Sequence, residues 1–226
     1  MPQNVPVVEK ILSANDRLAQ ENRTAIEAAG VFAINIMASP GAGKTSLIEQ
    51  TVRALQGKLH IGMINGDIAT SLDADRAAAA GAAAVQVNTG GECHLDAVML
   101  HDALPRLDLK SIDLLIVENV GNLICPAGFA LGTHKNVLVA SIPEGDDKPY
   151  KYPLMFTESE VIVLNKIDLL LDEAQGWDEA RALEYLARQC GPVAEGTVLV
   201  SAAKRWGLNR LLEEISLTLA GTAPPA

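Results

Sequence analysis

The eight residues Ala38-Ser39-Pro40-Gly41-Ala42-Gly43-Lys44-Thr45 set the fold class of this 226-residue chain. An apolar run at 31–37 precedes them, and apolar residues at helical spacing follow them over 47–55. A strand, a glycine-rich turn, Lys-Thr and a helix, in that order, predict a phosphate-binding loop. Glycine lets backbone N–H groups converge on phosphate oxygens, and the N-terminus of the helix directs its positive end at the anion.

The side chains of this loop have distinct predicted roles. Lys44 would reach the β- and γ-phosphates of a nucleotide, and the Thr45 hydroxyl would bind Mg²⁺. The first glycine of the usual pattern is replaced by Ala38. A chance glycine-rich turn is the alternative, and the flanking strand and helix argue against it. The other predicted phosphate contacts are Pro40, Gly41, Ala42, Gly43 and Ser46.

Composition and charge exclude several classes of protein. Apolar residues make up 49% of the chain, which is enough for a substantial core. The net charge of −10 argues against nucleic acid as a main partner. No apolar run approaches the ~20 residues that cross a bilayer, and the first residues do not resemble a signal peptide. We therefore expect a cytoplasmic protein without membrane contact, whose cysteines are ligands or buried thiols rather than disulfides.

Apolar runs alternate with helical patterns along the chain. Residues 7–29 have helical spacing, with Asn15 among the polar residues of the outer face, and Gly30 ends the helix. Because each expected strand is a continuous apolar run, we predict an α/β fold with a mostly parallel sheet covered by helices on both faces. The further expected strands are 59–64, 83–87, 112–117, 136–142, 161–164 and 197–200, and the further expected helices are 77–81, about 97–104, 177–189 and 207–219.

Two acidic residues at strand ends are candidates for Mg²⁺ binding and catalysis. Asp67 follows the strand at 59–64, where it would face the ligand crevice of an open sheet, although a turn aspartate is an equal alternative. Glu118 begins the pattern Glu-x-x-Gly that ends at Gly121. Its carboxylate can approach Mg²⁺ or the attacking water, and the Gly121 amide can bond the γ-phosphate, so this segment would respond to hydrolysis. Lys44, Asp67 and Glu118 are the predicted catalytic residues.

The stretch Asn165-Lys166-Ile167-Asp168 predicts recognition of guanine. The Asp168 carboxylate can accept hydrogen bonds from guanine N1–H and N2–H₂, a donor pair that adenine lacks. The methylene stem of Lys166 can lie along the ring, and Ser201, Ala202 and Lys204 would complete the pocket. With the phosphate loop, these stretches resemble the G-domain of GTPases. The resemblance implies P-loop NTPase architecture over 31–220. The residue pattern itself predicts an N-terminal helical extension at 1–30 and a tail at 221–226 that frays.

Cys93, His94 and Cys125 form a second candidate site. Two thiolates and an imidazole suit a soft divalent metal, either tetrahedral Zn²⁺ with a further ligand or square-planar Ni²⁺. A buried cysteine and a capping histidine are the alternative reading, while Cys190 matches no motif and is read as structural. Cys125 lies four residues past Gly121. If both assignments hold, metal affinity and nucleotide state are coupled, and the coupling is reciprocal in free energy.

Three further stretches carry a closer resemblance, namely GECHLDA at 91–97, ENVGNLICP at 118–126 and EGDDKPYKYP at 144–153. With the phosphate loop they resemble the hydrogenase nickel-incorporation GTPases, the HypB family, from Val31 onward. The resemblance implies a metal-binding GTPase that hydrolyses GTP to GDP and helps deliver Ni²⁺ into [NiFe]-hydrogenase during its maturation. We expect turnover with Mg²⁺ to be slow, because the sequence shows no arginine finger and no obvious general base. It also implies a GTP-dependent homodimer with the Ni²⁺ or Zn²⁺ site near the interface. Lys148 would then reach the nucleotide of the other subunit.

The same resemblance implies other hydrogenase maturation proteins and the hydrogenase large subunit as partners. A urease-type nickel GTPase is the main alternative, but its expected Cys-Pro-His motif is absent from Cys125-Pro126-Ala127. A small-molecule kinase would not need Asp168, and no basic acceptor pocket is visible. A metal-binding module with a vestigial nucleotide site is the fourth reading. Phosphate release from GTP but not from ATP would separate the two nickel GTPases from the other two.

Overall fold

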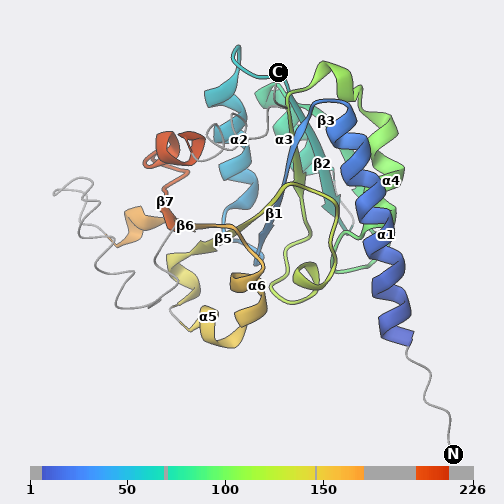
Figure 1. The fold of residues 1–226 in the computed structure, drawn as a ribbon. Coiled ribbons are helices and arrows are strands. Elements are labelled where there is room, and N and C mark those ends of the chain that lie inside the picture. Colours follow the sequence, from blue (N-terminus) through green and yellow to red (C-terminus); the bar gives the residue numbers. More distant parts are fainter. Residues whose placement is uncertain (1–6, 69–70, 146, 171–196, 214–226) are drawn as a thin grey trace, which may run out of the picture.

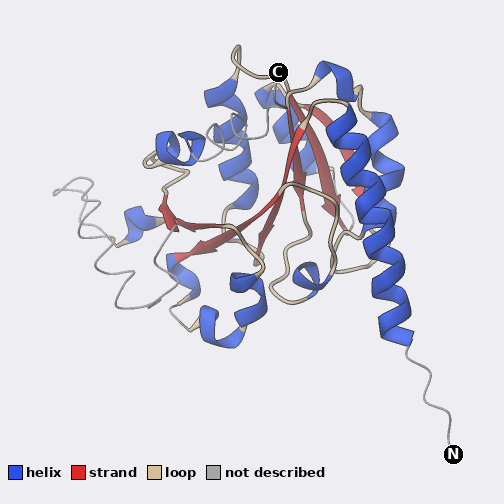
Figure 2. Cartoon of the chain, in the orientation of Figure 1, coloured by secondary structure: helices blue, strands red, loops and turns tan. Residues whose placement is uncertain are grey.

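In the part of the chain that the structure describes, a seven-stranded parallel sheet lies between two layers of helices (Figures 1 and 2). The computed structural model describes residues 7–68, 71–145, 147–170 and 197–213. The strands lie in the order β3-β2-β4-β1-β5-β6-β7, and all pairings between these neighbours are parallel. Their bounds are β1 Phe32–Ala38, β2 Ile61–Asp67, β3 Ala83–Asn88, β4 Leu114–Glu118, β5 Lys135–Ser141, β6 Val161–Asn165 and β7 Thr197–Leu199. The predicted α/β fold with a parallel sheet is confirmed.

The helices divide between the two faces of the sheet according to the alternation of side chains along β1. Phe32, Ile34 and Ile36 pack on the face covered by α2 and α3, whereas Ala33 packs on the face covered by α1 and α4. Met37 points to that second face too and packs with Phe156 of α6. The bounds are α1 Val7–Ala28, α2 Lys44–Leu55, α3 Leu72–Ala80, α4 Ala97–Ala103, α5 Lys148–Lys151 and α6 Pro153–Thr157. None of the helices in the described segments combines the length and hydropathy needed to cross a bilayer.

Two predicted elements differ in extent from the structure. The strand expected to end at residue 64 continues through Asp67, because Asn65-Gly66-Asp67 pair with Gln86-Val87-Asn88 of β3. The helix expected over 77–81 begins at Leu72, and its first turn carries Asp73 and Asp75, which suit the positive end of a helix. Gly81 ends this helix in a left-handed conformation, as predicted.

Some predictions fall outside the described residues or are wrong. The helix expected at 177–189, the structural reading of Cys190 and the tail at 221–226 lie outside the described residues. Of the helix expected over 207–219, residues 208–213 are described and helical. Asn15 was expected on the outer face of the first helix, and this is wrong. Its side chain is buried against α4, because the backbone polar groups beside it need hydrogen-bond partners.

The carboxyl ends of the parallel strands meet at one edge of the sheet. β1 ends at the phosphate-binding loop, β4 ends at Glu118, β2 ends at Asp67 and β6 ends at Asn165. The chain runs from β1 outward to β2 and crosses over β1 between β4 and β5, so the direction of winding changes beside β1. Such a change opens a crevice at the carboxyl ends of the strands, where α/β proteins bind their ligands.

Candidate functional site

The phosphate-binding loop forms one wall of a pocket of about 490 Å³ at this edge of the sheet. Gly41 and Gly43 adopt left-handed backbone conformations, with φ of 78° and 94°, and α2 begins directly after them at Lys44. The walls include Lys44 and Thr45 from α2, Asp67 from the end of β2 and Gly121 from the segment after β4. Most of the predicted phosphate contacts, Pro40, Gly41, Gly43 and Ser46, line the same pocket, while Ala42 is buried beneath the loop.

Glu118 lies beneath this pocket and is 1% exposed. Its Oε1 accepts a hydrogen bond from Thr45 Oγ1 at 2.7 Å and lies 3.5 Å from Lys44 Nζ. Its Oε2 is buried and has no hydrogen-bond partner among the residues that the structure describes. Burial raises the pKa of Glu118, and the Lys44 charge and the Thr45 hydrogen bond offset that rise in part. A buried carboxylate oxygen without a partner, beside a hydroxyl, fits the oxygen ligands of Mg²⁺.

The predicted base-binding residues lie at the other end of the phosphate-binding loop. Asn165 Nδ2 donates to Ala42 O at 2.9 Å, while its Oδ1 accepts from the backbone N–H of Lys166 and Ala202 at 2.8 and 3.1 Å. Lys166 Nζ donates to Gly41 O at 2.6 Å. A Cβ at Gly43 would lie 2.4 Å from Asn165 Nδ2, so the loop and the β6 end fit against each other only with glycine there. The amide of Asn165 thus joins three predicted nucleotide-binding segments.

Asp168 is held in a one-turn 3-10 helix, Ile167–Leu169, directly after β6. Its Oδ1 is buried, and no described residue forms a hydrogen bond with it. Across from it, Ser201 is fully buried and its Oγ accepts from the backbone N–H of Lys204 at 3.1 Å, which fixes the turn after β7. A buried carboxylate oxygen without a partner is costly, and a ligand N–H would remove that cost. This arrangement can accept a hydrogen bond from a base edge.

The three predicted soft-metal ligands lie together, although they come from different parts of the chain. Cys93 Sγ is 3.0 Å from Cys125 Sγ and 3.9 Å from His94 Nδ1. One ligand atom from each of the three residues lies within 4.8 Å of the others. The Cys125 thiol and the burial of the site raise the pKa of Cys93. The His94 ring packs on Phe129, with the centroids 4.0 Å apart. Two sulfurs and an imidazole nitrogen at this spacing can bind one soft divalent ion.

One segment connects the two sites. It begins at Glu118, beneath the nucleotide pocket. Gly121, which lines the pocket, packs so closely on the phosphate-binding loop that a Cβ there would lie 3.3 Å from Pro40. Asn122 Nδ2 then donates to Cys93 O at 3.2 Å, three residues before Cys125. Asn119 Oδ1 accepts from the backbone N–H of Leu95 at 2.9 Å. Residues 118–125 therefore touch both the phosphate-binding loop and the backbone on either side of His94.

Two residues differ from or add to the predicted site. Lys148 does not line the nucleotide pocket of its own chain, and its Nζ lies 5.7 Å from the centroid of the Tyr152 ring. Arg76 of α3 lines the pocket and was not predicted, since an arginine in a helix of alanines gives no sequence signal. Its Nη2 contacts Glu49 Oε2 at 2.9 Å and Ser46 Oγ at 3.2 Å.

Comparison with known proteins shows the family of the chain. The family described as CobW/HypB/UreG, nucleotide-binding domain, matches residues 32–188. The hydrogenase maturation factor HypB of Rhizobium leguminosarum is 49% identical over 186 residues, which are 81% of this chain and 62% of that protein. The probable hydrogenase maturation factor HypB of Methanocaldococcus jannaschii is 46% identical over 209 residues, which are 92% of this chain and 93% of that protein. The chain therefore spans less than two thirds of the first relative and nearly all of the second.

Solved structures give the same result. HypB from Helicobacter pylori in complex with nickel superposes with a TM-score of 0.80 at 32% identity, over 94% of this chain and 98% of that chain. Hydrogenase maturation factor HypB from Archaeoglobus fulgidus superposes with a TM-score of 0.77 at 36% identity, over 92% of this chain and 99% of that chain. The chain belongs to the CobW/HypB/UreG family and, within it, to the hydrogenase maturation factors of the HypB type.

Proposed function

We propose that the chain hydrolyses GTP to GDP with Mg²⁺ and that Lys44, Asp67 and Glu118 are its catalytic residues. Water would attack the γ-phosphate in line with the leaving oxygen, while Lys44 Nζ and the loop amides bind the charge that develops. Thr45, Asp67 and Glu118 would hold Mg²⁺, which neutralises charge on the phosphate oxygens. The orphaned Glu118 Oε2 supports this assignment. Turnover is slow in this proposal, because the Arg76 guanidinium is engaged by Glu49 and Ser46.

The base preference is for guanine, and Asp168 selects it. The buried Asp168 Oδ1 has no hydrogen-bond partner within the described residues, which supports a role as acceptor for a base N–H. Lys166 supports the ring through its stem, since its Nζ is already anchored on Gly41 O. Ser201, Ala202 and Lys204 close the pocket from the turn after β7.

The cargo is Ni²⁺, bound by Cys93, His94 and Cys125 and delivered to [NiFe]-hydrogenase during its maturation. The grouping of these three side chains supports a metal site, and a structural relative was solved as a complex with nickel. Zn²⁺ is the competing ion, because thiolate and imidazole ligands suit both metals. The working form is a homodimer that assembles with GTP, in which Lys148 reaches the nucleotide of the other subunit. Other hydrogenase maturation proteins and the hydrogenase large subunit are the proposed partners.

The observation that carries this proposal is the segment from Glu118 to Cys125. Its first residue bonds Thr45 in the nucleotide pocket, and its last residue lies 3.0 Å, sulfur to sulfur, from Cys93. A movement of Gly121 on γ-phosphate binding would shift Asn122 and Cys125 together, so nucleotide state and metal affinity would change together.

The test is a titration of Ni²⁺, and in parallel of Zn²⁺, into the full chain with GDP and with a non-hydrolysable GTP analogue. We expect an affinity difference of roughly 5-fold or more between the two nucleotide states, the size of an ordinary allosteric coupling. Cys125→Ala should weaken Ni²⁺ binding in both states and remove the difference. Equal Ni²⁺ affinities in the two states would exclude the coupling. Unchanged affinity in Cys125→Ala would exclude the metal site itself.

A further inference from the structure

Two asparagines on the inner face of α1 require an explanation. Asn15 is 6% exposed and Asn22 is fully buried. Asparagine is unfavourable inside a helix, because its side chain competes for nearby backbone groups. A buried amide is also costly unless its hydrogen bonds are made. Two such residues seven positions apart, on the side of the helix that packs on the domain, point to a task that an apolar residue could not perform.

Both amides bind the same two segments of the domain. Asn15 Oδ1 accepts from Ala97 N at 2.9 Å, and its Nδ2 donates to Ala130 O at 2.8 Å. Asn22 Nδ2 donates to Ala97 O at 2.9 Å and to Leu131 O at 3.2 Å. The helix α1 therefore joins the start of α4 to residues 130–131 at two places, through four hydrogen bonds.

These two segments carry the ligands of the candidate metal site. Ala97 lies three residues after His94, and Ala130 lies five residues after Cys125. Neither ligand segment belongs to a strand, so the sheet does not fix the distance between them. The amides of α1 bind both segments at once, in addition to the direct hydrogen bond from Asn122 to Cys93 O.

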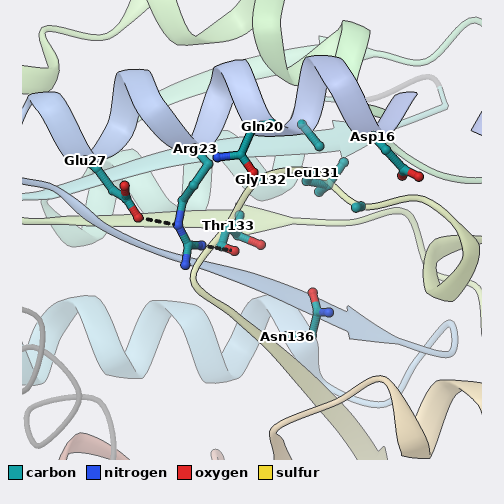
Figure 3. Close-up of a pocket in the computed structure, with 10 residues that line it drawn as sticks. Asp16, Gln20, Arg23, Glu27, Leu131, Gly132, Thr133 and Asn136 are labelled. Carbon is teal, nitrogen blue, oxygen red and sulfur yellow. Dashed lines mark hydrogen bonds and ion pairs between the residues drawn. The ribbon is translucent and has the colours of Figure 1, made fainter. Parts of the chain in front are cut away.

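A third link lies at the surface of the same seam (Figure 3). Arg23 of α1 donates through Nη1 to Thr133 O, while its Nε pairs with Glu27 Oε1 at 2.6 Å. Gly132 lies so close beneath α1 that a Cβ there would be 2.1 Å from Ala19 O. A pocket of about 510 Å³ opens along this seam, between α1 and residues 130–136. The contact between α1 and this loop is thus continuous from Asn15 to Arg23.

We propose that α1 is a brace for the metal site, with Asn15 and Asn22 as positioning residues for Cys93, His94 and Cys125. The proposal rests on the metal-binding function proposed above. The brace holds the two ligand-bearing segments at the spacing that lets both sulfurs and the imidazole reach one ion. Partners that hydrogen-bond a metal ligand typically change metal affinity about 10- to 100-fold when they are lost. The α1 amides bond the chain a few residues away from the ligands, so we expect an effect at the lower end of that range.

The test compares Asn15→Asp with Ile26→Ala in the full chain. Asn15→Asp keeps the acceptor for Ala97 N and loses the donor to Ala130 O, so it breaks the bridge between the segments. Ile26 is a fully buried residue of the same helix. Ile26→Ala should destabilise the protein at least as much as Asn15→Asp does, but it leaves the hydrogen bonds between α1 and the two segments in place. We expect Asn15→Asp to weaken Ni²⁺ binding roughly 10-fold, while Ile26→Ala leaves the Ni²⁺ affinity within about 2-fold.

A second measurement needs no metal. In a Cys190→Ser background, diamide takes up two electrons and two protons from Cys93 and Cys125 and leaves a disulfide between them. Because the sulfurs lie 3.0 Å apart, this cross-link should form quickly in the parent and several-fold more slowly in Asn15→Asp. If Asn15→Asp does not fold, Arg23→Gln, which removes the partly buried hydrogen bond to Thr133 O, should slow the cross-link to a smaller extent.

The two readouts separate this proposal from the metal function. Unchanged cross-linking rates in Asn15→Asp and Arg23→Gln would overturn the brace, and so would an equal loss of Ni²⁺ affinity in Ile26→Ala and Asn15→Asp. If Cys125→Ala retained full Ni²⁺ affinity, the metal assignment would fail. The cross-linking rates would in that case still decide whether α1 sets the distance between the two sulfurs.

Discussion

The nucleotide pocket and the Cys93-His94-Cys125 cluster are held in place by different parts of the molecule. The nucleotide pocket is built on strand ends, because β1, β2, β4 and β6 all terminate at it. The metal cluster lies in segments outside the strands, which are tied to each other by asparagine side chains such as Asn119 and Asn122. One site inherits its geometry from the sheet, and the other depends on individual hydrogen bonds.

This difference has a consequence for motion. Strand ends in the middle of a parallel sheet shift only if the sheet itself deforms, and packed interiors resist that. Segments joined by a few amides can adopt a second arrangement by exchanging those bonds. A site that must bind and then release a metal ion suits the second construction. We therefore expect substitutions to affect the two sites separately, except within 118–125, where the sites share one segment.

The largest effect that separates the sites is expected for Asp168→Asn. The amide cannot accept both guanine hydrogen bonds as the carboxylate does, and each charged hydrogen bond contributes about 1.5–3 kcal/mol, so GTP affinity should fall on the order of 10²- to 10⁴-fold. Xanthosine triphosphate carries a carbonyl oxygen in place of the N2 amino group of guanine. This oxygen can accept a hydrogen bond from the side-chain amide that Asp168→Asn introduces, so the variant should bind xanthosine triphosphate better than GTP. Calorimetry measures both affinities, with Ni²⁺ affinity of the nucleotide-free protein as the control. Undiminished GTP binding would remove Asp168 from the base pocket.

A smaller effect, confined to the metal side, is expected for Gly132→Ala. The new Cβ would lie 2.1 Å from Ala19 O, and φ at this position is 92°, so the loop must move away from α1. Left-handed strain of about 1–2 kcal/mol and overpacking of about 1–3 kcal/mol should lower the melting temperature by several degrees. Gly128→Ala is the matched control in the same loop, because a Cβ there meets nothing within 4 Å.

Nucleotide affinity should be nearly the same in both glycine variants, because the nucleotide pocket does not depend on this loop. Ni²⁺ affinity should fall in Gly132→Ala and stay at the parent value in Gly128→Ala. A loss of GTP binding in Gly132→Ala equal to its loss of Ni²⁺ binding would show that the two sites are not separable in the way described.

The sequence was sufficient to predict the elements that form the nucleotide pocket. β1 is a mostly apolar run buried on both faces, and the phosphate-binding loop that follows it is a local motif whose geometry depends on Gly41 and Gly43. Local sequence patterns of this kind predict structure without knowledge of how the rest of the chain packs. The order of the strands could not be obtained in the same way, because pairs such as Phe32 and Leu114 are far apart in the chain.

The supports of the metal cluster could not be predicted for a related reason. Asn15 and Asn22 are polar residues of a kind usually found on the exposed face of a helix. They are buried here because they form hydrogen bonds with backbone groups of segments that lie far away in the sequence. Cys93, His94 and Cys125 were grouped correctly from their chemistry and from resemblance, but nothing local brings position 93 next to position 125. Arg76 was missed because its place in the pocket follows from the packing of α3 beside α2.

The smallest effect concerns two carboxylates, Glu118 beneath the nucleotide pocket and Glu49 beside it. Their contributions to folding stability should depend on pH in opposite directions. Burial raises the pKa of Glu118 above its ordinary value of 4.5, so the unfolded chain releases this proton first. The folded protein therefore loses stability as pH rises from 4.5 through the folded pKa, and Glu118→Gln does not. Hydrogen bonds from Arg53 and Arg76 lower the pKa of Glu49. The ionised Glu49 side chain therefore stabilises the folded protein above pH 4.5, and this stabilisation is lost as pH falls through the pKa of Glu49 in the folded state.

Melting temperatures from pH 4 to 8, without Mg²⁺ or nucleotide, should resolve these signs. As pH rises, the melting temperature of the parent should fall relative to that of Glu118→Gln. Relative to Glu49→Gln it should rise by at most a few degrees, since a partly exposed ion pair contributes about 0–1 kcal/mol. With Mg²⁺ and GDP, the parent should become more stable than Glu118→Gln, because the cation removes the cost of burying the charge. Parallel curves for the parent and Glu118→Gln at every pH would contradict this account of Glu118. The segment from Glu118 to Cys125 would then begin at a residue whose charge does not respond to the nucleotide site, and only the packing of Gly121 on Pro40 would remain to couple that segment to the phosphate-binding loop.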